Sequence, residues 1–282
     1  MNERTKLLEA KGALEKMFGG FVPLVSITLG SGLGYMVSLL EESKMCPYSN
    51  IPHCPTPGAT GHDGELWLGK LGGVPVVMLR GRVHLYEGYT VHEVVFLTRL
   101  MVMMGVRNLI LTHATGSVTR NLEPGDIVGV HSQIALTCPD PTSGQDTPLL
   151  GAEFSPVGEN VFHSGLLTLA KKCALAEQVS FHRGVSCWKF GRTYESAAEG
   201  DAMARLGADV ATMSTIPEVM AAAQMGAKVL DLALVTDMVA NVRPTSDGEV
   251  SHNEVLEIVE LMKPSFGRLV SRIVKEMGQL LT

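Results

Sequence analysis

A buried strand runs into a dense polar cluster in the stretch Val74-Pro75-Val76-Val77-Met78-Leu79, followed by Gly81-Arg82-Val83-His84-Leu85-Tyr86-Glu87-Gly88-Tyr89. The first part is almost entirely apolar, which is typical of a strand inside a domain. In the second part, Arg82, His84 and Tyr86 lie on one face wherever the backbone stays extended. Buried polar groups are costly unless partners satisfy them. The concentration therefore predicts a binding site rather than a solvated strand end.

Strands and helices alternate along the rest of the chain. We predict strands over residues 24–29, 65–71, 74–79, 108–111, 126–136, 183–190, 208–213 and 228–236, with a hairpin at Gly72-Gly73. We predict helices over residues 1–18, from 34 to 40, 90–104, 164–178, 195–206, from 215 onward and 253–281, the last bent near Pro264. The pattern predicts one α/β domain spanning residues 1–282, with a mixed central sheet flanked by helices.

Two further segments have distinct signatures. Thr215 and Glu218 have the spacing of a capping box at the start of an alanine-rich helix. Residues 137–161 are rich in Pro, Gly, Ser and Asp and show little periodicity. A loop of that length is usually functional or mobile.

Composition narrows the class of protein. The chain has 282 residues, 45% of them hydrophobic, and a net charge of −6, which argues against nucleic-acid and anionic-membrane surfaces. No apolar run approaches the roughly 18 residues that span a bilayer, and the N-terminus has no apolar signal core. Five cysteines without a C-x-x-C pair suit free thiols in a reducing compartment. We therefore expect a soluble cytoplasmic protein.

Polar residues follow several of the predicted strands. Gly30-Ser31-Gly32-Leu33-Gly34 is neither G-x-G-x-x-G nor a P-loop, but a glycine turn that opens a helix can bind an anion. Ligands in open α/β sheets bind outside the carboxyl ends of the strands. The polar residues at the ends of the predicted strands are Ser31, Arg82, His84, residues 113–117, residues 213–215 and residues 236–237. Together they predict one composite pocket.

The sequence lacks the usual signatures of two other chemistries. The nine histidines show no metal-ligand spacing, so we expect no metal site. No Gly-x-Ser-x-Gly with a matching order of triad partners is present, so we expect no covalent nucleophile.

Taken together, the motifs resemble the trimeric class of purine nucleoside phosphorylases. They are Gly30-Ser31-Gly32-Leu33-Gly34, Gly61-His62-x-Gly64, the Gly81–Tyr89 stretch, Gly125-Asp126, Tyr194-Glu195, Leu206-Gly207-Ala208-Asp209, Met213-Ser214-Thr215-x-Pro217-Glu218 and His252, in the family's order. The resemblance implies reversible phosphorolysis of purine ribonucleosides to free base and ribose 1-phosphate. It also implies a homotrimer that binds phosphate as co-substrate and uses no cofactor.

The resemblance implies a role for each site residue. Phosphate would contact Ser31, Arg82, His84, Ala114 and Ser214; ribose would contact Tyr86, Met213 and His252; the base would contact Tyr194, Glu195, Asp237 and His113. The catalytic residues would be His84 and Asp237. A phosphate dianion would stabilise the oxocarbenium-like transition state, and a proton or hydrogen bond at purine N7 would help the base leave.

Three departures from the family pattern lie near the predicted base site. Asp237 and His113 stand where the family has asparagine, and Arg192 stands where it has proline. An ionised aspartate only accepts hydrogen bonds, so it suits a 6-amino group, and it must be protonated to donate. We therefore expect a preference shifted toward 6-aminopurines. Residues 137–161 match poorly; there, Phe154 is a weak candidate for the aromatic side chain that the family places on a neighbour's sugar.

Several alternatives remain open at this stage. The chain could be a nucleoside-binding homologue with little catalysis. It could be a 5′-methylthioadenosine phosphorylase, a family that also uses aspartate at the base but lacks the Tyr86-Glu87-Gly88-Tyr89 signature. A preference for xanthosine or guanosine is a further alternative.

Overall fold

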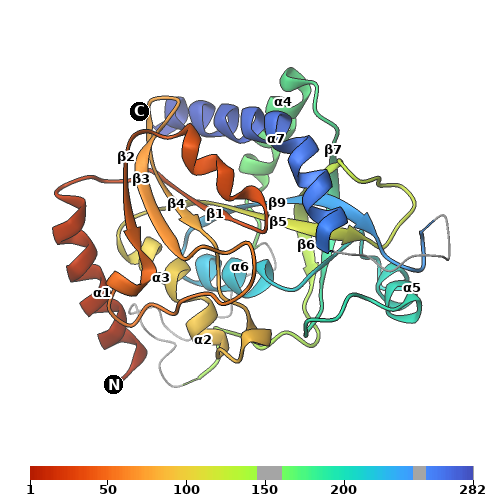
Figure 1. The fold of residues 1–282 in the computed structure, drawn as a ribbon, viewed down its shortest axis with the longest axis horizontal. Helices are drawn as coiled ribbons and strands as arrows, with labels where there is room; N and C mark the ends of the chain where they lie inside the picture. Colours follow the sequence, from red (N-terminus) through yellow and green to blue (C-terminus); the bar gives the residue numbers. More distant parts are fainter. Residues whose placement is uncertain (145–160, 244–251, 282) are drawn as a thin grey trace.

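The computed structural model describes residues 1–144, 161–243 and 252–281 (Figure 1). The helices and strands in these ranges are α1 (Glu3–Phe18), β1 (Val25–Leu29), η1 (Leu33–Leu39), β2 (Glu41–Pro47), η2 (Tyr48–Asn50), β3 (Glu65–Leu71), β4 (Val74–Arg80), η3 (Leu85–Glu87), α2 (Val91–Val94), α3 (Phe96–Met103), β5 (Asn108–Ser117), β6 (Ile127–Ile134), α4 (Ser164–Glu177), β7 (Phe181–Trp188), α5 (Ala197–Arg205), β8 (Val210–Thr212), α6 (Thr215–Gln224), β9 (Lys228–Met238) and α7 (His252–Leu281). The η elements are 3₁₀ helices.

The strands form one mixed sheet. Their order is β2-β3-β4-β1-β5-β8-β7-β6-β9, and β9 also pairs with β5. The last five strands in this order therefore close into a barrel, and the first four extend from β5 as an open sheet. The β3–β4 and β2–β3 pairs are antiparallel, whereas β1 runs parallel to both β4 and β5. The predicted single α/β domain with a mixed sheet is confirmed.

Strand direction gathers the polar strand ends at one edge. Strands β4, β1, β5 and β9 are mutually parallel, so their carboxyl ends point the same way. Strand β8 runs antiparallel to β5, with Gly116 opposite Ala211. The chain beyond β8 therefore returns toward the residues that precede Gly116.

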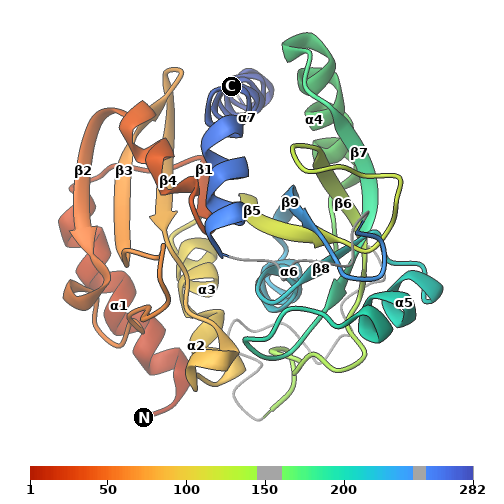
Figure 2. The ribbon, with the colours of Figure 1, turned by 45° about the vertical axis from the view of Figure 1, so that its right-hand side comes forward.

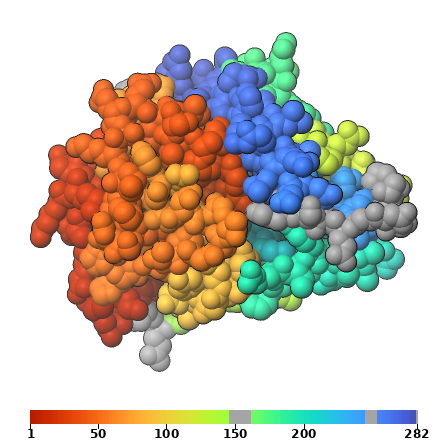
Figure 3. All heavy atoms as spheres, viewed as in Figure 1, coloured from red at the N-terminus to blue at the C-terminus, as the bar shows by residue number. Residues whose placement is uncertain are grey.

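Helices cover both faces of the sheet, as Figure 2 shows. Helices α1, α3 and α6 pack on one face and η1, α4 and α7 on the other, each layer around its own apolar cluster. In α1, for example, Leu7, Ala10, Leu14 and Phe18 are buried at helical spacing, as predicted for an amphipathic helix. In Figure 3 the C-terminal helix lies directly against the N-terminal strands. Helix α7 contributes Val255 to the cavity at the strand ends, and the turn after β1 contributes Ser31.

Some predicted elements differ in detail. The glycine turn at Gly30 leads into a 3₁₀ helix, η1, rather than an α-helix. The helix predicted over residues 90–104 is divided into α2 and α3 at Val95. Strand β2 was not predicted, and β9 continues past Asp237 to Met238. The long C-terminal helix is confirmed as α7, and Figure 1 shows it changing direction along its length.

The predicted capping box of α6 is wrong. Ser214 is the N-cap residue and makes no side-chain capping hydrogen bond. The Thr215 hydroxyl instead donates to Asp231 Oδ2 at 3.0 Å, and the Glu218 carboxylate is buried 3.0 Å from Arg82 Nε. Thr215 and Glu218 thus interact with Asp231 and Arg82, which are distant in sequence, instead of capping the start of α6.

Candidate active site

A cavity of about 440 Å³ lies at the edge where the parallel strands end. Eleven of the twelve residues that the sequence analysis selected line it: Ser31, Arg82, His84, Tyr86, His113, Ala114, Tyr194, Glu195, Met213, Ser214 and Asp237. The twelfth, His252, begins α7, but its side chain lies outside the described part of the structure, as does Phe154. Val255, three residues after His252, does line the cavity. The predicted composite pocket is present.

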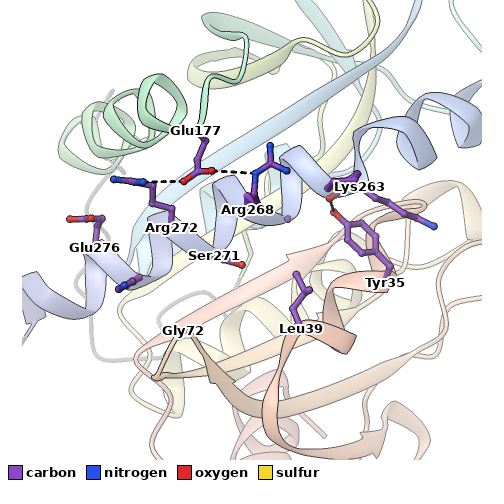
Figure 4. Close-up of a pocket in the computed structure, with 12 residues that line it drawn as sticks. Tyr35, Leu39, Gly72, Glu177, Lys263, Arg268, Ser271, Arg272 and Glu276 are labelled. Carbon is purple, nitrogen blue, oxygen red and sulfur yellow. Dashed lines mark hydrogen bonds and ion pairs between the residues drawn. The ribbon is translucent and has the colours of Figure 1, made fainter.

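A larger cavity of about 600 Å³ lies elsewhere, beside α7, and Figure 4 shows its lining. There Arg268 and Arg272 pair with Glu177 of α4 at 3.3 and 3.0 Å, and Lys263 lies over the Tyr35 ring. The two arginines are solvent-exposed and Glu177 is partly exposed. Ion pairs of this kind contribute little to stability. The smaller cavity holds the buried, incompletely satisfied polar groups, so we take it as the site.

At one end of the site, His62 positions Ser31. The Arg82 backbone N–H donates to His62 Nδ1 at 3.1 Å, which leaves Nε2 as the protonated nitrogen of a neutral ring. Nε2 lies 3.1 Å from Ser31 Oγ and can donate to it. The Ser31 hydroxyl hydrogen then stays available for a ligand acceptor.

A buried ion pair fixes the Arg82 side chain. Its Nε lies 3.0 Å from Glu218 Oε2, and its Nη1 donates to the Thr112 carbonyl at 3.0 Å. Its Nη2 is buried without a hydrogen-bond partner among the described residues. Burial raises the pKa of Glu218, while Arg82 opposes that rise. Arg82 is therefore a pre-positioned cation with one donor group unused.

His84 is held as a neutral acceptor. Its backbone N–H and Nδ1 lie 2.8 and 2.9 Å from Glu87 Oε1, and its ring stacks on Tyr86 with centroids 4.6 Å apart. Burial, with Arg82 nearby, lowers the pKa of His84 to about 3. With Nδ1–H donating to Glu87, the lone pair of Nε2 is left to accept, which suits the P–OH group of hydrogen phosphate.

His84 should make the fold sensitive to acid. A histidine whose pKa falls on folding has no effect while it is neutral in both states, above about pH 7; as the pH drops, only the unfolded chain gains the proton. At pH 5 the wild-type free energy of unfolding should have lost about 2 kcal/mol through this group. Urea titrations of wild type and His84→Gln between pH 7.5 and 5 should show a shallower loss in the variant. The exposed His131→Gln is the control, and equal slopes for wild type and His84→Gln would contradict this assignment.

The opposite end of the site holds two half-buried carboxyl groups, those of Asp237 and Glu195. Burial raises the pKa of Asp237, and the Thr236 hydroxyl, which donates to Oδ1 at 3.0 Å, opposes the rise. Burial likewise raises the pKa of Glu195, with Lys189 opposing and Asp237 adding to it. Tyr194 also lines this end. The guanidinium carbon Cζ of Arg192 lies over the Tyr86 ring, 5.9 Å from its centroid. Both carboxyls therefore hold a proton more readily than ordinary ones.

Strand β5 runs between the two ends of the cavity, so its length gives their separation. Arg82 contacts the carbonyl of Thr112, and Gly116 pairs with Asp237. Four residues of strand separate these contacts, which is about 13 Å. The cavity thus has a cationic end and a carboxyl end separated by roughly the length of a small extended ligand.

His113 lies nearer the cationic end than the base position expected for it. Its Nε2 is 3.4 Å from Asp231 Oδ1, and Asp231 also accepts from Thr215 at the start of α6. His113 precedes Gly116 by three residues, so its backbone lies about 10 Å from the pairing with Asp237. The contact between His113 and the base that the resemblance implies stays a prediction.

Four residues that orient the site were not predicted from the sequence: His62, Glu87, Asp231 and Glu218. His62, Glu87 and Glu218 stand inside the motifs that carried the resemblance, which was the available signal. Asp231 lies within an apolar strand and had no local signal of its role.

Two absences concern the described residues only. Across residues 1–144, 161–243 and 252–281, no group of three or more His, Cys, Asp or Glu side chains is arranged to hold a metal ion. No helix in the same ranges combines the length and apolarity that crossing a membrane requires.

Comparisons with known proteins agree with this geometry. Residues 25–275 match the model of the phosphorylase superfamily. The chain is 35% identical over 276 residues to purine nucleoside phosphorylase 1 of Geobacillus stearothermophilus, covering 98% of this chain and 99% of that protein.

Solved structures are similar over nearly the whole chain. Isoform 2 of purine nucleoside phosphorylase from Schistosoma mansoni, in complex with cytosine and ribose-1-phosphate, has a TM-score of 0.89 and 32% identity over 96% of each chain. A Schistosoma mansoni purine nucleoside phosphorylase in complex with adenosine has a TM-score of 0.85 and 32% identity, covering 95% of this chain and 96% of that one.

Proposed function

The chain belongs to the purine nucleoside phosphorylases of the phosphorylase superfamily, and we propose that it cleaves purine ribonucleosides with phosphate, with a preference for 6-aminopurines. Phosphate is the co-substrate and no cofactor takes part. One observation carries the proposal: a single cavity joins a fixed arginine and two serines at one end to two readily protonated carboxyls at the other.

Phosphate binds at the cationic end in this proposal. Arg82 Nη2 and the hydroxyls of Ser31 and Ser214 donate to its oxygens, with the Ala114 backbone beside them. Neutral His84 accepts from the P–OH group and so orients the dianion. The dianion attacks C1′ and stabilises the positive charge that develops on the sugar.

The ribose lies between the two ends. Tyr86 and Met213 line the middle of the cavity and pack against the sugar in this proposal. His252 contacts the 5′-hydroxyl, as the family resemblance implies. The nucleoside is thus held with C1′ directed toward the phosphate, and this positioning supplies part of the rate acceleration.

The base lies at the carboxyl end, with Tyr194 on its wall. A protonated Asp237 donates to N7 with one oxygen and accepts from a 6-amino group with the other. A 6-oxopurine nucleoside presents acceptors at both positions, so the same carboxyl satisfies only one. Adenine N1 is also an acceptor, which a protonated Glu195 can meet. The raised pKa values of both carboxyls therefore support the 6-aminopurine preference.

The assembly and compartment are also part of the proposal. The family resemblance supports a homotrimer, which predicts a mass in solution three times that of one chain; a monomeric mass would contradict it. The five cysteines, all free in the structure, are compatible with the cytoplasm.

A substrate panel tests the proposal. Adenosine, inosine, guanosine, xanthosine and 5′-methylthioadenosine are incubated with and without phosphate, and the free base is measured by chromatography. We expect base release only with phosphate, and fastest from adenosine. Tight binding without turnover would instead indicate a binding homologue, release without phosphate a hydrolase, and a dominant methylthioadenosine activity the related phosphorylase.

A further inference from the structure

The His113–Asp231 pair lies next to the phosphate end and takes no part in the reaction as described so far. His113 is 3% exposed and Asp231 is fully buried. Their facing atoms, Nε2 and Oδ1, are 3.4 Å apart, and neither makes a hydrogen bond to a described residue. Nδ1, the other ring nitrogen of His113, is likewise buried without a hydrogen-bond partner in the described ranges. Buried polar atoms are rarely left unsatisfied, so the pair is incomplete without a ligand.

Two sets of contacts place His113 beside the phosphate site. Arg82 Nη1 donates to the carbonyl of Thr112, the preceding residue. A side chain at Gly30 would meet the His113 Cα at 2.8 Å and Arg82 Nη1 at 3.3 Å, so the turn that carries Ser31 packs on both. On the other side, Asp231 links His113 to Thr215, the neighbour of Ser214. His113 therefore stands between the two halves of the anion site.

The charged side chains around His113 do not neutralise the negative charge of a bound phosphate. Its charged neighbours on the surrounding elements are Asp231 of β9, Arg82 after β4 and Glu218 of α6; His62 and His84 complete the titratable groups of this end. With Glu218 ionised, Arg82 and the two carboxylates sum to −1, and with Glu218 protonated they sum to zero. A phosphate dianion would thus meet no net positive charge, and buried charges require compensation.

We propose that His113, held by Asp231, takes up a proton when phosphate binds and donates a hydrogen bond from Nδ1 to the dianion. The proton comes from solvent and stays on the imidazole, so that no covalent bond of phosphate changes in this step. Asp231 stabilises the resulting imidazolium through Nε2 and fixes the direction of the ring. The inference rests on the proposed phosphate co-substrate and assigns His113 to phosphate rather than to the base.

The test measures phosphate binding alone, by phosphorus NMR titration of wild type and His113→Asn between pH 7.5 and 9. Inorganic phosphate is predominantly the dianion in this range, with a monoanion fraction that is appreciable at pH 7.5 and falls toward pH 9. An ordinary imidazole is mostly neutral in the same range. Binding linked to one proton should weaken about tenfold per pH unit in wild type. His113→Asn should be nearly independent of pH and, at pH 7.5, bind phosphate on the order of 10- to 100-fold more weakly.

Two further arms separate this role from a structural one. The affinity for adenine alone should be unchanged in His113→Asn, because the base lies at the far end of the cavity. Asp231→Asn keeps the imidazole and should flatten the pH slope, which gives a second test if His113→Asn does not fold.

The outcomes are distinct. A wild-type slope that persists in His113→Asn would show that another group, such as Glu218, takes up the proton and would overturn the inference. Loss of adenine binding with phosphate binding intact would overturn it in favour of a base contact. If wild type binds no phosphate at any pH, the proposed function itself fails.

Discussion

Arg82→Met is expected to reduce phosphorolysis by at least about 100- to 1,000-fold, the usual effect of removing one donor aimed at the reacting charge. Among the described residues, Arg82 is the one charged donor that the proposed phosphate site holds when the ligand arrives, because His84 is neutral. The loss should appear mainly as a raised KM for phosphate, together with a lower kcat where the dianion is misplaced. Initial rates at varied phosphate concentration measure both.

The same substitution should destabilise the fold. Removing one member of a buried ion pair leaves the other charge uncompensated, which costs about 3–5 kcal/mol. Glu218 is 3% exposed and its remaining hydrogen bond, from the Thr98 hydroxyl, is long at 3.4 Å. Denaturant unfolding at pH 7.5 should therefore show a large drop in the free energy of unfolding.

A double variant separates the two effects. Arg82→Met/Glu218→Gln removes the orphaned charge, so it should recover much of the stability but none of the activity. If the double variant regains turnover, Arg82 acts through the fold alone. If Arg82→Met keeps its wild-type phosphate dependence, the phosphate site is elsewhere.

Asp237→Asn should shift the ratio of kcat/KM for adenosine over inosine by on the order of 100-fold toward inosine. The asparagine amide can donate to O6 of a 6-oxopurine while its oxygen accepts from N7–H, but it has no acidic proton to transfer to N7 of adenosine. A protonated Asp237 matches the donor and acceptor of a 6-aminopurine, whereas it leaves one acceptor of a 6-oxopurine unpaired. Steady-state rates on both nucleosides at saturating phosphate measure the ratio.

The pH profile provides a second readout for Asp237. Burial raises its pKa, so the protonated form persists to a higher pH than an ordinary carboxyl, and adenosine turnover should fall as the pH rises through that value. The remaining adenosine turnover of Asp237→Asn should not show this fall with rising pH. Asp201→Asn, a solvent-exposed carboxyl on α5, is the matched control and should leave both the ratio and the profile unchanged. An unchanged ratio in Asp237→Asn would refute the assigned base contact.

The strand ends that form the site were predictable because their signals are local. Apolar runs mark β1 and β4 as buried strands, and the polar residues after them stand at defined positions. Parallel strands place their carboxyl ends at one edge, so Ser31, Arg82 and Asp237 could be grouped from the sequence alone. The structure confirms that they line one cavity.

What could not be predicted depends on tertiary contacts. Strand β2 is exposed along most of its length and carries charged residues, so it shows no alternation that would distinguish it from a loop. Glu218 has the spacing of a capping box, but in the folded protein its carboxylate is buried against Arg82 and does not cap the helix. Asp231 meets His113 only because β5 and β9 pair in parallel register. Contacts between segments that are distant in sequence cannot be recognised from the local sequence pattern.

The most direct test of the account follows the fate of phosphate when the enzyme acts on adenosine. Phosphorus NMR of the reaction should show a new phosphate ester of ribose, with its phosphorus at C1, appearing in equal amount to free adenine. Omitting phosphate should stop adenine release entirely. Free ribose in place of ribose 1-phosphate, or adenine released at the same rate without phosphate, would contradict the central claim that bound phosphate is the nucleophile.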